Sequence, residues 1–130
     1  MTHPANIPVD IKLHRKSRIL ELTYGDGSRF ELSCEYLRVH SPSAEVRGHG
    51  EGQETLQTGK INVNLKELVP VGNYALKLVF DDGHDSGLYD WNYLRDLGEN
   101  HDLHWQHYLD RLDQAGASRD PDLSVVKIMG

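Results

Sequence analysis

Residues 80–95 read FDDGHDSGLYDWNYLR, and they place a turn rich in aspartate and glycine between two apolar segments. An alternating apolar run ends at Phe80, the turn contains His84, and an aromatic amphipathic segment follows. A polar loop held between two rigid elements is a common place for functional residues. A second polar loop, VHSPSAEVRGHG at residues 39–50, has similar ingredients. We therefore expect the remainder of the chain to act as a scaffold that brings these two loops together.

The composition fits one domain of modest size. The chain has 130 residues and a net charge of −6, and acidic residues outnumber basic ones by 20 to 14. Nucleic-acid binding usually requires a basic patch. No apolar run reaches the ~20 residues of a membrane span, and the N-terminus lacks the pattern of a signal peptide. Cys34 is the one cysteine, so an intramolecular disulfide is excluded. We expect a soluble cytoplasmic protein with neither nucleic-acid nor membrane partners.

Alternating hydrophobicity predicts a largely antiparallel sheet, since every second side chain of a strand lies on the same face. A Gly-Asp-Gly-Ser turn at 25–28 joins two of the alternating runs, which is typical of a hairpin within a meander. The run that ends at Phe80 has two partly apolar faces and is therefore expected to be a central strand. Residues 69–73, which include Pro70 and Gly72, are expected to form a turn. The expected strands span residues 9–14, 19–24, 30–32, 61–66 and 74–80.

Capping residues predict three helices. Ser33, Asp90 and Asn100 can each accept a hydrogen bond from a free amide at a helix N-terminus, while Gly98 and Gly116 are expected helix stops. In the last helix, apolar residues at i, i+3, i+4 and i+7 form one buried stripe. The expected helices span residues 34–38, 91–97 and 101–115. The stripe consists of Trp105, Tyr108, Leu109 and Leu112.

Three segments lack these patterns. Residues 1–6 are expected to be disordered, residues 41–60 to form a long mobile loop, and residues 117–130 to form a flexible tail. The sequence thus predicts one domain over residues 7–116. Its fold class is α+β, with a mostly antiparallel β-sheet and two C-terminal helices packed on it.

Three of the eight histidines, His101, His104 and His107, lie three residues apart in the last expected helix. Successive steps of three turn the side chain by about −60°, so the outer two point about 120° apart. Three ligands spaced this way do not converge easily on one metal ion. We therefore assign them structural or surface roles.

His84 is a better candidate because it lies in a tight loop beside the expected central strand. Imidazole is a common zinc ligand, and a carboxylate can hold its second nitrogen. His40, Glu45 and His49 supply further nitrogen and oxygen donors. One interpretation is therefore a metal site that includes His84 and His49. The other interpretation is that His84 forms hydrogen bonds with backbone carbonyls and thereby stabilises the conformation of its loop.

The sequence gives little direct support for catalysis. It contains no Gly-x-Ser-x-Gly elbow, no phosphate-binding Gly-x-x-x-x-Gly-Lys-Ser/Thr and no His-Glu-x-x-His. Cys34 falls in a short amphipathic helix, where buried cysteines are usually inert. Trp91 is expected in the core, with a partner anchor as the alternative. We expect a protein that is not an enzyme.

Two motifs read together indicate a family. Residues 36–46, YLRVHSPSAEV, and residues 82–94, DGHDSGLYDWNYL, resemble the gamma-butyrobetaine hydroxylase-like N-terminal domain, also called DUF971, over about residues 7–116. In eukaryotic hydroxylases of that family this domain precedes an iron- and 2-oxoglutarate-dependent catalytic domain and holds a zinc ion through three cysteines and one histidine. Other relatives are stand-alone bacterial proteins or are appended to P-loop ATPases that carry iron–sulfur clusters.

The resemblance implies that His84 matches the zinc-binding histidine, while the three cysteine positions fall near Ser41, Ser43 and Val46. Hydroxyls are poorer zinc ligands than thiolates, so we expect no resident cofactor, with zinc as the alternative. The expected function is a non-catalytic binding module with a protein partner, serving iron–sulfur or oxygenase proteins. The alternative is a zinc-binding protein with a degenerate His/Glu site around His84. The expected binding residues are Arg38, His40, Ser41, Ser43, Glu45, Asp82, His84 and Trp91.

Overall fold

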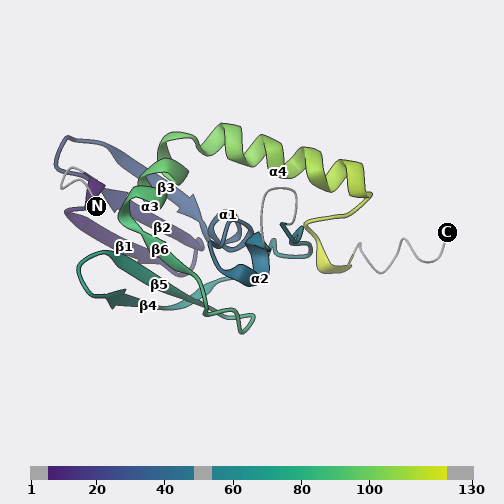
Figure 1. Cartoon of the computed structure of the whole chain (residues 1–130), viewed down its shortest axis with the longest axis horizontal. Helices are drawn as coiled ribbons and strands as arrows, with labels where there is room; N and C mark the ends of the chain where they lie inside the picture. Colours follow the sequence, from purple (N-terminus) through teal and green to yellow (C-terminus); the bar gives the residue numbers. More distant parts are fainter. Residues whose placement is uncertain (1–5, 49–53, 123–130) are drawn as a thin grey trace.

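Two three-stranded antiparallel sheets and four helices make up the fold in the computed structural model, which describes residues 6–48 and 54–122 (Figure 1). The first sheet has the order β1-β2-β3 and the second the order β4-β5-β6. The strands are β1 (Asp10–His14), β2 (Ile19–Thr23), β3 (Arg29–Ser33), β4 (Leu65–Val71), β5 (Ala75–Phe80) and β6 (Leu88–Asp90). The helices are α1 (Cys34–Val39), α2 (Ala44–Arg47), α3 (Trp91–Glu99) and α4 (His101–Ala115). The predicted α+β class is confirmed, with α3 and α4 packed on the sheets.

One core joins the two sheets. Leu20 and Leu22 of β2 are fully buried, as the alternation predicted, and they belong to the same cluster as Leu78 of β5. β5 pairs with both β4 and β6, so the prediction of a central strand is confirmed. Helices α1 and α3 add aromatic and aliphatic side chains to this cluster. Burying such side chains contributes about 1.5–3 kcal/mol each.

Two of the three predicted caps form as expected. The Ser33 hydroxyl accepts a hydrogen bond from the Tyr36 amide at 3.0 Å, and the Asp90 carboxylate accepts one from the Tyr93 amide at 2.8 Å. Asn100 occupies the N-cap position of α4 without a side-chain hydrogen bond to the helix. These caps fix where α1 and α3 begin, directly after β3 and β6.

Gly98 does not end α3, contrary to the prediction, because the helix continues to Glu99. A Cβ atom at Gly98 would lie 2.6 Å from the Phe30 ring. Glycine is therefore used here for close packing of the helix on β3. Gly116 does act as the predicted stop of α4, with φ of 63° in the left-handed region, where glycine carries no steric penalty.

The fourth strand lies further along the chain than predicted. Residues 61–62 form a turn, residues 63–64 have no regular secondary structure, and β4 begins at Leu65 and runs through Pro70, in the segment predicted as a turn. β4 is an edge strand of its sheet, and a proline is tolerated there because one side of an edge strand needs no ladder hydrogen bond. Val9 and Tyr74, the first residues of two expected strands, lie outside β1 and β5 and are 69% and 54% exposed.

The predicted 41–60 loop contains α2 and three buried residues, Ser41, Ser43 and Val46. Its residues 49–53, like residues 1–5 and 123–130, lie outside the described part of the chain. The first residues of the predicted tail contact the domain. Arg119 binds the Glu35 carboxylate through two hydrogen bonds of 2.7 and 2.8 Å, and the Gly59 amide donates to Ser118 O at 2.9 Å.

Candidate functional site

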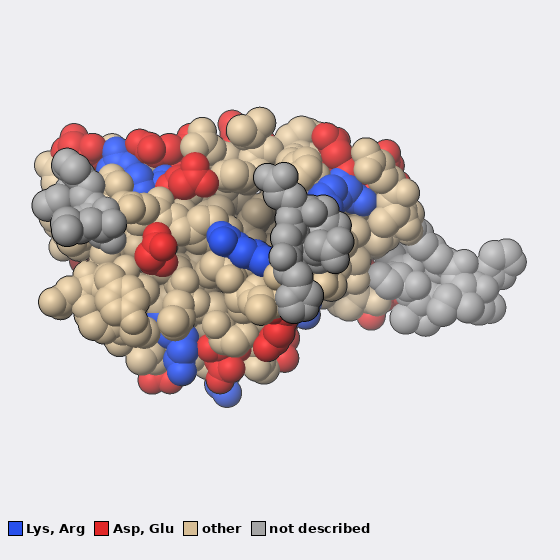
Figure 2. Space-filling model, in the orientation of Figure 1, with Lys and Arg blue, Asp and Glu red and all other residues tan. Residues whose placement is uncertain are grey.

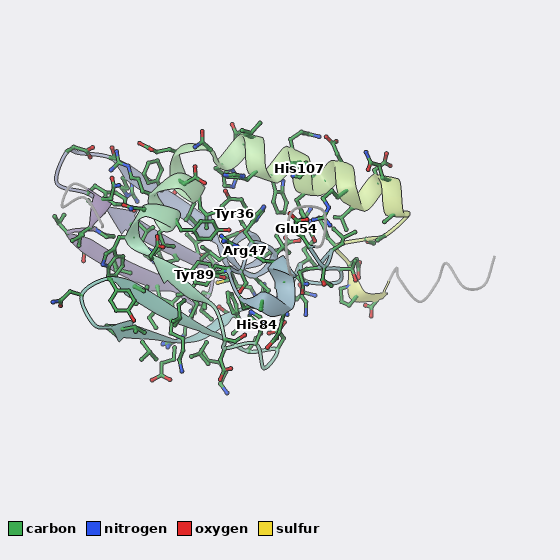
Figure 3. All side chains as sticks on the ribbon, in the orientation of Figure 1. Tyr36, Arg47, Glu54, His84, Tyr89 and His107 are labelled. Atoms are coloured by element: carbon green, nitrogen blue, oxygen red, sulfur yellow. The ribbon has the colours of Figure 1, made fainter. Side chains whose placement is uncertain are left out.

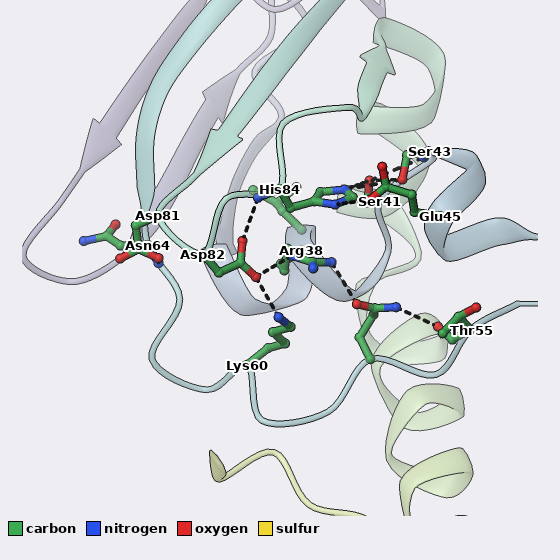
Figure 4. A network of polar contacts seen from close by, with 12 residues as sticks. Arg38, Ser41, Ser43, Glu45, Thr55, Lys60, Asn64, Asp81, Asp82 and His84 are labelled. Carbon is green, nitrogen blue, oxygen red and sulfur yellow. Dashed lines mark hydrogen bonds and ion pairs between the residues drawn. The ribbon is translucent and has the colours of Figure 1, made fainter.

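The two polar loops singled out from the sequence meet in the structure (Figure 4). The loop between α1 and α2 contributes Ser41 and Ser43, and α2 contributes Glu45. The loop between β5 and β6 contributes Asp82 and His84. This His84 cluster consists of Ser41, Ser43, Glu45, Asp82, Ser86 and His84.

The His84 ring is held on both sides by the opposite loop. Its Nε2 lies 2.8 Å from Ser41 Oγ and 3.3 Å from Ser43 Oγ. Its Nδ1 lies 3.3 Å from Glu45 Oε2. A carboxylate only accepts hydrogen bonds, so the proton belongs on Nδ1 and the Ser41 hydroxyl donates to Nε2. The ring therefore connects the two loops through side chains, whereas one of the two interpretations from the sequence had it binding backbone carbonyls.

The backbone of His84 is also fixed. Its amide donates to Asp82 Oδ1 at 3.1 Å, and its carbonyl accepts from the Phe80 amide at 3.0 Å. Burial and the nearby Arg38 guanidinium lower the pKa of His84, which favours the neutral ring. Only 7% of the residue is exposed. The neutral imidazole is therefore buried, with a polar partner at each ring nitrogen.

A second network extends from Asp82 to α1. Asp82 Oδ2 accepts from Arg38 Nε at 2.8 Å and from Lys60 Nζ at 2.7 Å. Arg38 Nη1 also donates to Gln57 Oε1 at 3.0 Å. Partial burial raises the pKa of Asp82, but the hydrogen bonds from Lys60, the His84 amide and Arg38 outweigh it and bring the pKa to about 2. The network ties α1, the 54–60 segment and the β5–β6 loop together.

Ser41, His84 and Glu45 follow the hydrogen-bond order of a hydrolytic triad. The surroundings of Ser41 do not suit acyl transfer, because the residue is 1% exposed. Its Oγ is packed so tightly that a Cβ atom at Gly87 would lie 2.5 Å from it. A substrate carbonyl needs room about 3 Å from the nucleophile. These side chains serve as a cross-link between loops.

The donor set around His84 also fits a zinc ion poorly. Structural zinc sites use four ligands, mostly thiolates and imidazoles. Ser41 and Ser43 offer neutral hydroxyls to Nε2, Val46 offers no donor, and the nearby carboxylate of Glu45 bonds the opposite nitrogen. Among the described residues, no group of three or more His, Cys, Asp or Glu side chains could hold a metal ion.

Two other predicted site residues, His40 and Trp91, are not part of the His84 cluster. His40 Nδ1 lies 2.9 Å from Tyr36 O, and its ring packs against Tyr36 and His104. Trp91 is 8% exposed in the core and donates from Nε1 to Asn73 O at 2.8 Å, so it is not an exposed partner anchor. His49 lies outside the described residues.

A pocket of about 960 Å³ opens between α2 and α4, next to the His84 cluster. Figure 3 shows Arg47, Glu54 and His107 following one another from α2 to α4, and Figure 2 shows a hollow beside basic side chains on this face. The Arg47 guanidinium carbon lies 4.7 Å from the centre of the Tyr93 ring. The α2–α4 pocket is lined chiefly by Val46, Arg47, Thr55, Tyr93, Tyr108 and Arg111.

The sequence did not single out this pocket. His107 and Arg111 stand four residues apart, which places them on one face of α4. This spacing is the sequence feature that could have indicated a polar surface on that helix. Arg47 belongs to a segment predicted as loop, so the approach of α2 to α4 could not be anticipated. Gln57 and Lys60, which complete the Arg38–Asp82 network, were missed for the same reason.

The fold and site define a small α+β domain in which two polar loops close around one buried histidine. The chain belongs to the family described as gamma-butyrobetaine hydroxylase-like, N-terminal, whose sequence model matches residues 11–95. The resemblance stated from the two motifs is thereby confirmed. No match is found among curated proteins. No helix within the described residues is long and apolar enough to cross a membrane.

Solved structures support the assignment. One NMR solution structure is 55% identical to this chain, with a TM-score of 0.77, and the match covers 88% of this chain and 90% of that one. A second NMR solution structure is 56% identical, with a TM-score of 0.74, and the match covers 93% of this chain and 92% of that one. A crystal structure from Acidithiobacillus ferrooxidans, described as a protein of unknown function in the DUF971 family, is 38% identical with a TM-score of 0.63. The match covers 75% of this chain and 98% of that one.

Proposed function

We propose that this chain is a non-catalytic binding module whose recognition site for a partner protein is the α2–α4 pocket. The pocket itself is the observation that carries the proposal. Its volume of about 960 Å³ lies within the range of pockets that bind ligands. Apolar and aromatic side chains line it together with a few charged groups, which is the usual composition of a recognition site.

The neighbouring His84 cluster supports a binding role by rigidity rather than reactivity. Its polar atoms are bonded to one another, and Ser41 lies both in the cluster and in the pocket wall. The cross-link therefore holds the start of α2 in place beside the pocket. A preorganised wall reduces the conformational entropy lost on binding.

The family relationship suggests the kind of partner. Proteins that resemble this chain include domains joined to oxygenases and to iron–sulfur cluster carriers, so we propose partners of these two classes, in the cytoplasm. The second candidate, zinc binding around His84, is favoured only by the burial of that ring beside Ser41 and Ser43. A direct test for zinc is given in the Discussion.

The test blocks the pocket and uses a matched control. Thr55 and Thr58 are both exposed and belong to one segment, but Thr55 lines the pocket and Thr58 does not. Host proteins captured by the wild type, Thr55→Trp and Thr58→Trp are quantified by mass spectrometry. We expect specific partners to be lost with Thr55→Trp and kept with Thr58→Trp. Equal capture by all three proteins would reject the pocket as the recognition site.

A further inference from the structure

Two arginines face the α2–α4 pocket without a carboxylate partner among the described residues. Arg47 stacks on Tyr93, and Arg111 donates from Nη2 to Glu54 O at 3.2 Å. By contrast, Arg38 and Arg119 elsewhere in the fold are each bonded to a carboxylate. A guanidinium whose charge is not matched inside the protein is suited to a carboxylate or phosphate supplied from outside.

The remainder of the pocket is largely apolar. The Tyr93 hydroxyl donates to His40 O at 2.6 Å and the Tyr108 hydroxyl donates to Gln57 O at 2.7 Å, so neither hydroxyl has a hydrogen left to donate to a ligand carboxylate. What the two tyrosines offer a ligand is ring surface, beside Val39 and Val46. Aromatic surface next to arginine is typical of binding hot spots.

The His40 ring, which lines the pocket, adds no fixed charge of its own. Burial lowers the pKa of His40 to about 4, so its ring is neutral near pH 7. Glu54 places one carboxylate at the rim, opposite in sign to Arg47 and Arg111. Among the described residues that line the pocket, the two guanidiniums outnumber this carboxylate, in a chain whose net charge is −6. The charge of these described lining residues is therefore opposite to that of the whole molecule.

We propose that the α2–α4 pocket binds an acidic segment of the partner protein, with carboxylates on Arg47 and Arg111 and an apolar or aromatic side chain against Tyr93 and Val46. This inference rests on the proposed function, because it specifies the ligand of the same pocket. A peptide is favoured over a small metabolite because the pocket lies on the surface between two helices, α2 and α4. The Glu54 carboxylate at the rim repels further negative charge on the segment, so the segment is expected to carry only a few carboxylates.

The test is an NMR titration of the full, ¹⁵N-labelled chain with two short capped peptides, acetyl-Glu-Phe-Glu-amide and its Gln-Phe-Gln counterpart, and with phenylacetate as a small carboxylate. We expect the acidic peptide to shift amide signals of α2 and α4 and to bind at least about fivefold more tightly than the neutral one, since charge-assisted hydrogen bonds are the stronger kind. Equal binding of the two peptides would overturn the proposal. Binding of phenylacetate as tight as that of the acidic peptide would overturn the choice of a peptide.

Four variants locate the charge. Arg47→Ala and Arg111→Ala should each weaken the acidic peptide about five- to tenfold, and Glu54→Gln should strengthen it. Arg15→Ala, which removes an exposed guanidinium bonded to Lys66 O, should leave binding unchanged. Arg47 also packs on Tyr93, so Arg111→Ala is decisive if Arg47→Ala perturbs the fold. Partner capture that is blocked by Thr55→Trp but unaffected by either arginine variant would reject the acidic segment and leave the proposed function standing.

Discussion

The Nε2 atom of His84 lies 2.8 Å from Ser41 Oγ, and this contact joins loops that are 43 residues apart. In the family resemblance, Ser41 stands where a metal-binding cysteine is expected. We therefore expect the hydrogen bond to hold together, without a metal ion, the junction that the resemblance associates with zinc.

Ser41→Ala should destabilise the protein by about 1–3 kcal/mol, since it leaves a buried imidazole nitrogen with only the longer Ser43 contact. The matched control is Ser86→Ala. Ser86 donates to Glu45 in an exposed part of the same cluster, so its loss should change stability by less than about 0.5 kcal/mol. Urea unfolding of both variants measures the difference. Equal effects would show that the buried contact does not stabilise the junction.

The purified protein should fold without zinc. Where zinc is structural, its removal unfolds the domain because binding energy is then folding energy. We expect no stoichiometric zinc in protein prepared without a histidine tag, and the same Tm with and without chelator. The positive control carries Ser41→Cys, Ser43→Cys and Val46→Cys, and should acquire zinc and a chelator-sensitive Tm. One zinc per wild-type chain together with a large drop in Tm on chelation would contradict the prediction.

Stability should fall between about pH 6.5 and pH 4, mainly through His40. Burial lowers the pKa of His40 from 6.5 to about 4, so the unfolded chain binds the proton first as the pH falls. The stability that the neutral ring supports is complete above pH 6.5 and is reduced by roughly 3 kcal/mol near pH 4. His84, whose pKa is also lowered, acts in the same direction.

His40→Asn is the variant that checks this prediction, because an amide nitrogen can replace the hydrogen bond to Tyr36 O without titrating. Urea unfolding at pH 7.5, 6.5, 5.5 and 4.5 should show a weaker pH dependence for the variant than for the wild type. Asp82 and Glu21, with pKa values of about 2, lose their contribution mostly at lower pH. An unchanged slope in the variant would assign the pH dependence to other groups.

Gly98→Ala should destabilise the protein by about 1–3 kcal/mol, although alanine favours helices. The added Cβ would meet the Phe30 ring at 2.6 Å. Phe30→Ala removes that ring, so the Gly98→Ala substitution should cost less in the Phe30→Ala background. A double-mutant cycle measures the coupling. Additive effects would mean that the contact does not restrict residue 98.

The sequence predicted those elements whose signals are local. The alternation around Leu20 and Leu22 reports burial directly, and the caps at Ser33 and Asp90 depend on neighbouring amides. The error in the predicted position of β4, which includes Pro70, has a different cause. Whether a proline breaks a strand or lies on an edge depends on the strands around it, which the local sequence does not specify. The role of Gly98 likewise depends on Phe30, far away in the chain.

The candidate site was predictable in part. The two motifs correctly singled out Ser41, Ser43, Glu45 and His84 as neighbours, because the family resemblance related distant loops. The α2–α4 pocket was not predicted, since its walls come from the four-residue helix α2 and from residues 107–114 of α4. A helix of that length has too few residues for a periodic pattern.

The pair between Glu35 and Arg119 sets a practical boundary for dividing the chain. The Glu35 side chain is 6% exposed, and Arg119 supplies its cation from beyond the end of α4. A fragment that stops at Gly116 would keep β1–β6 and α1–α4 but would leave the buried Glu35 carboxylate without its cation. A fragment that stops at Arg95, where the family match ends, would also cut α3 in two. Fusion proteins and truncated expression fragments should therefore retain residues through at least 119.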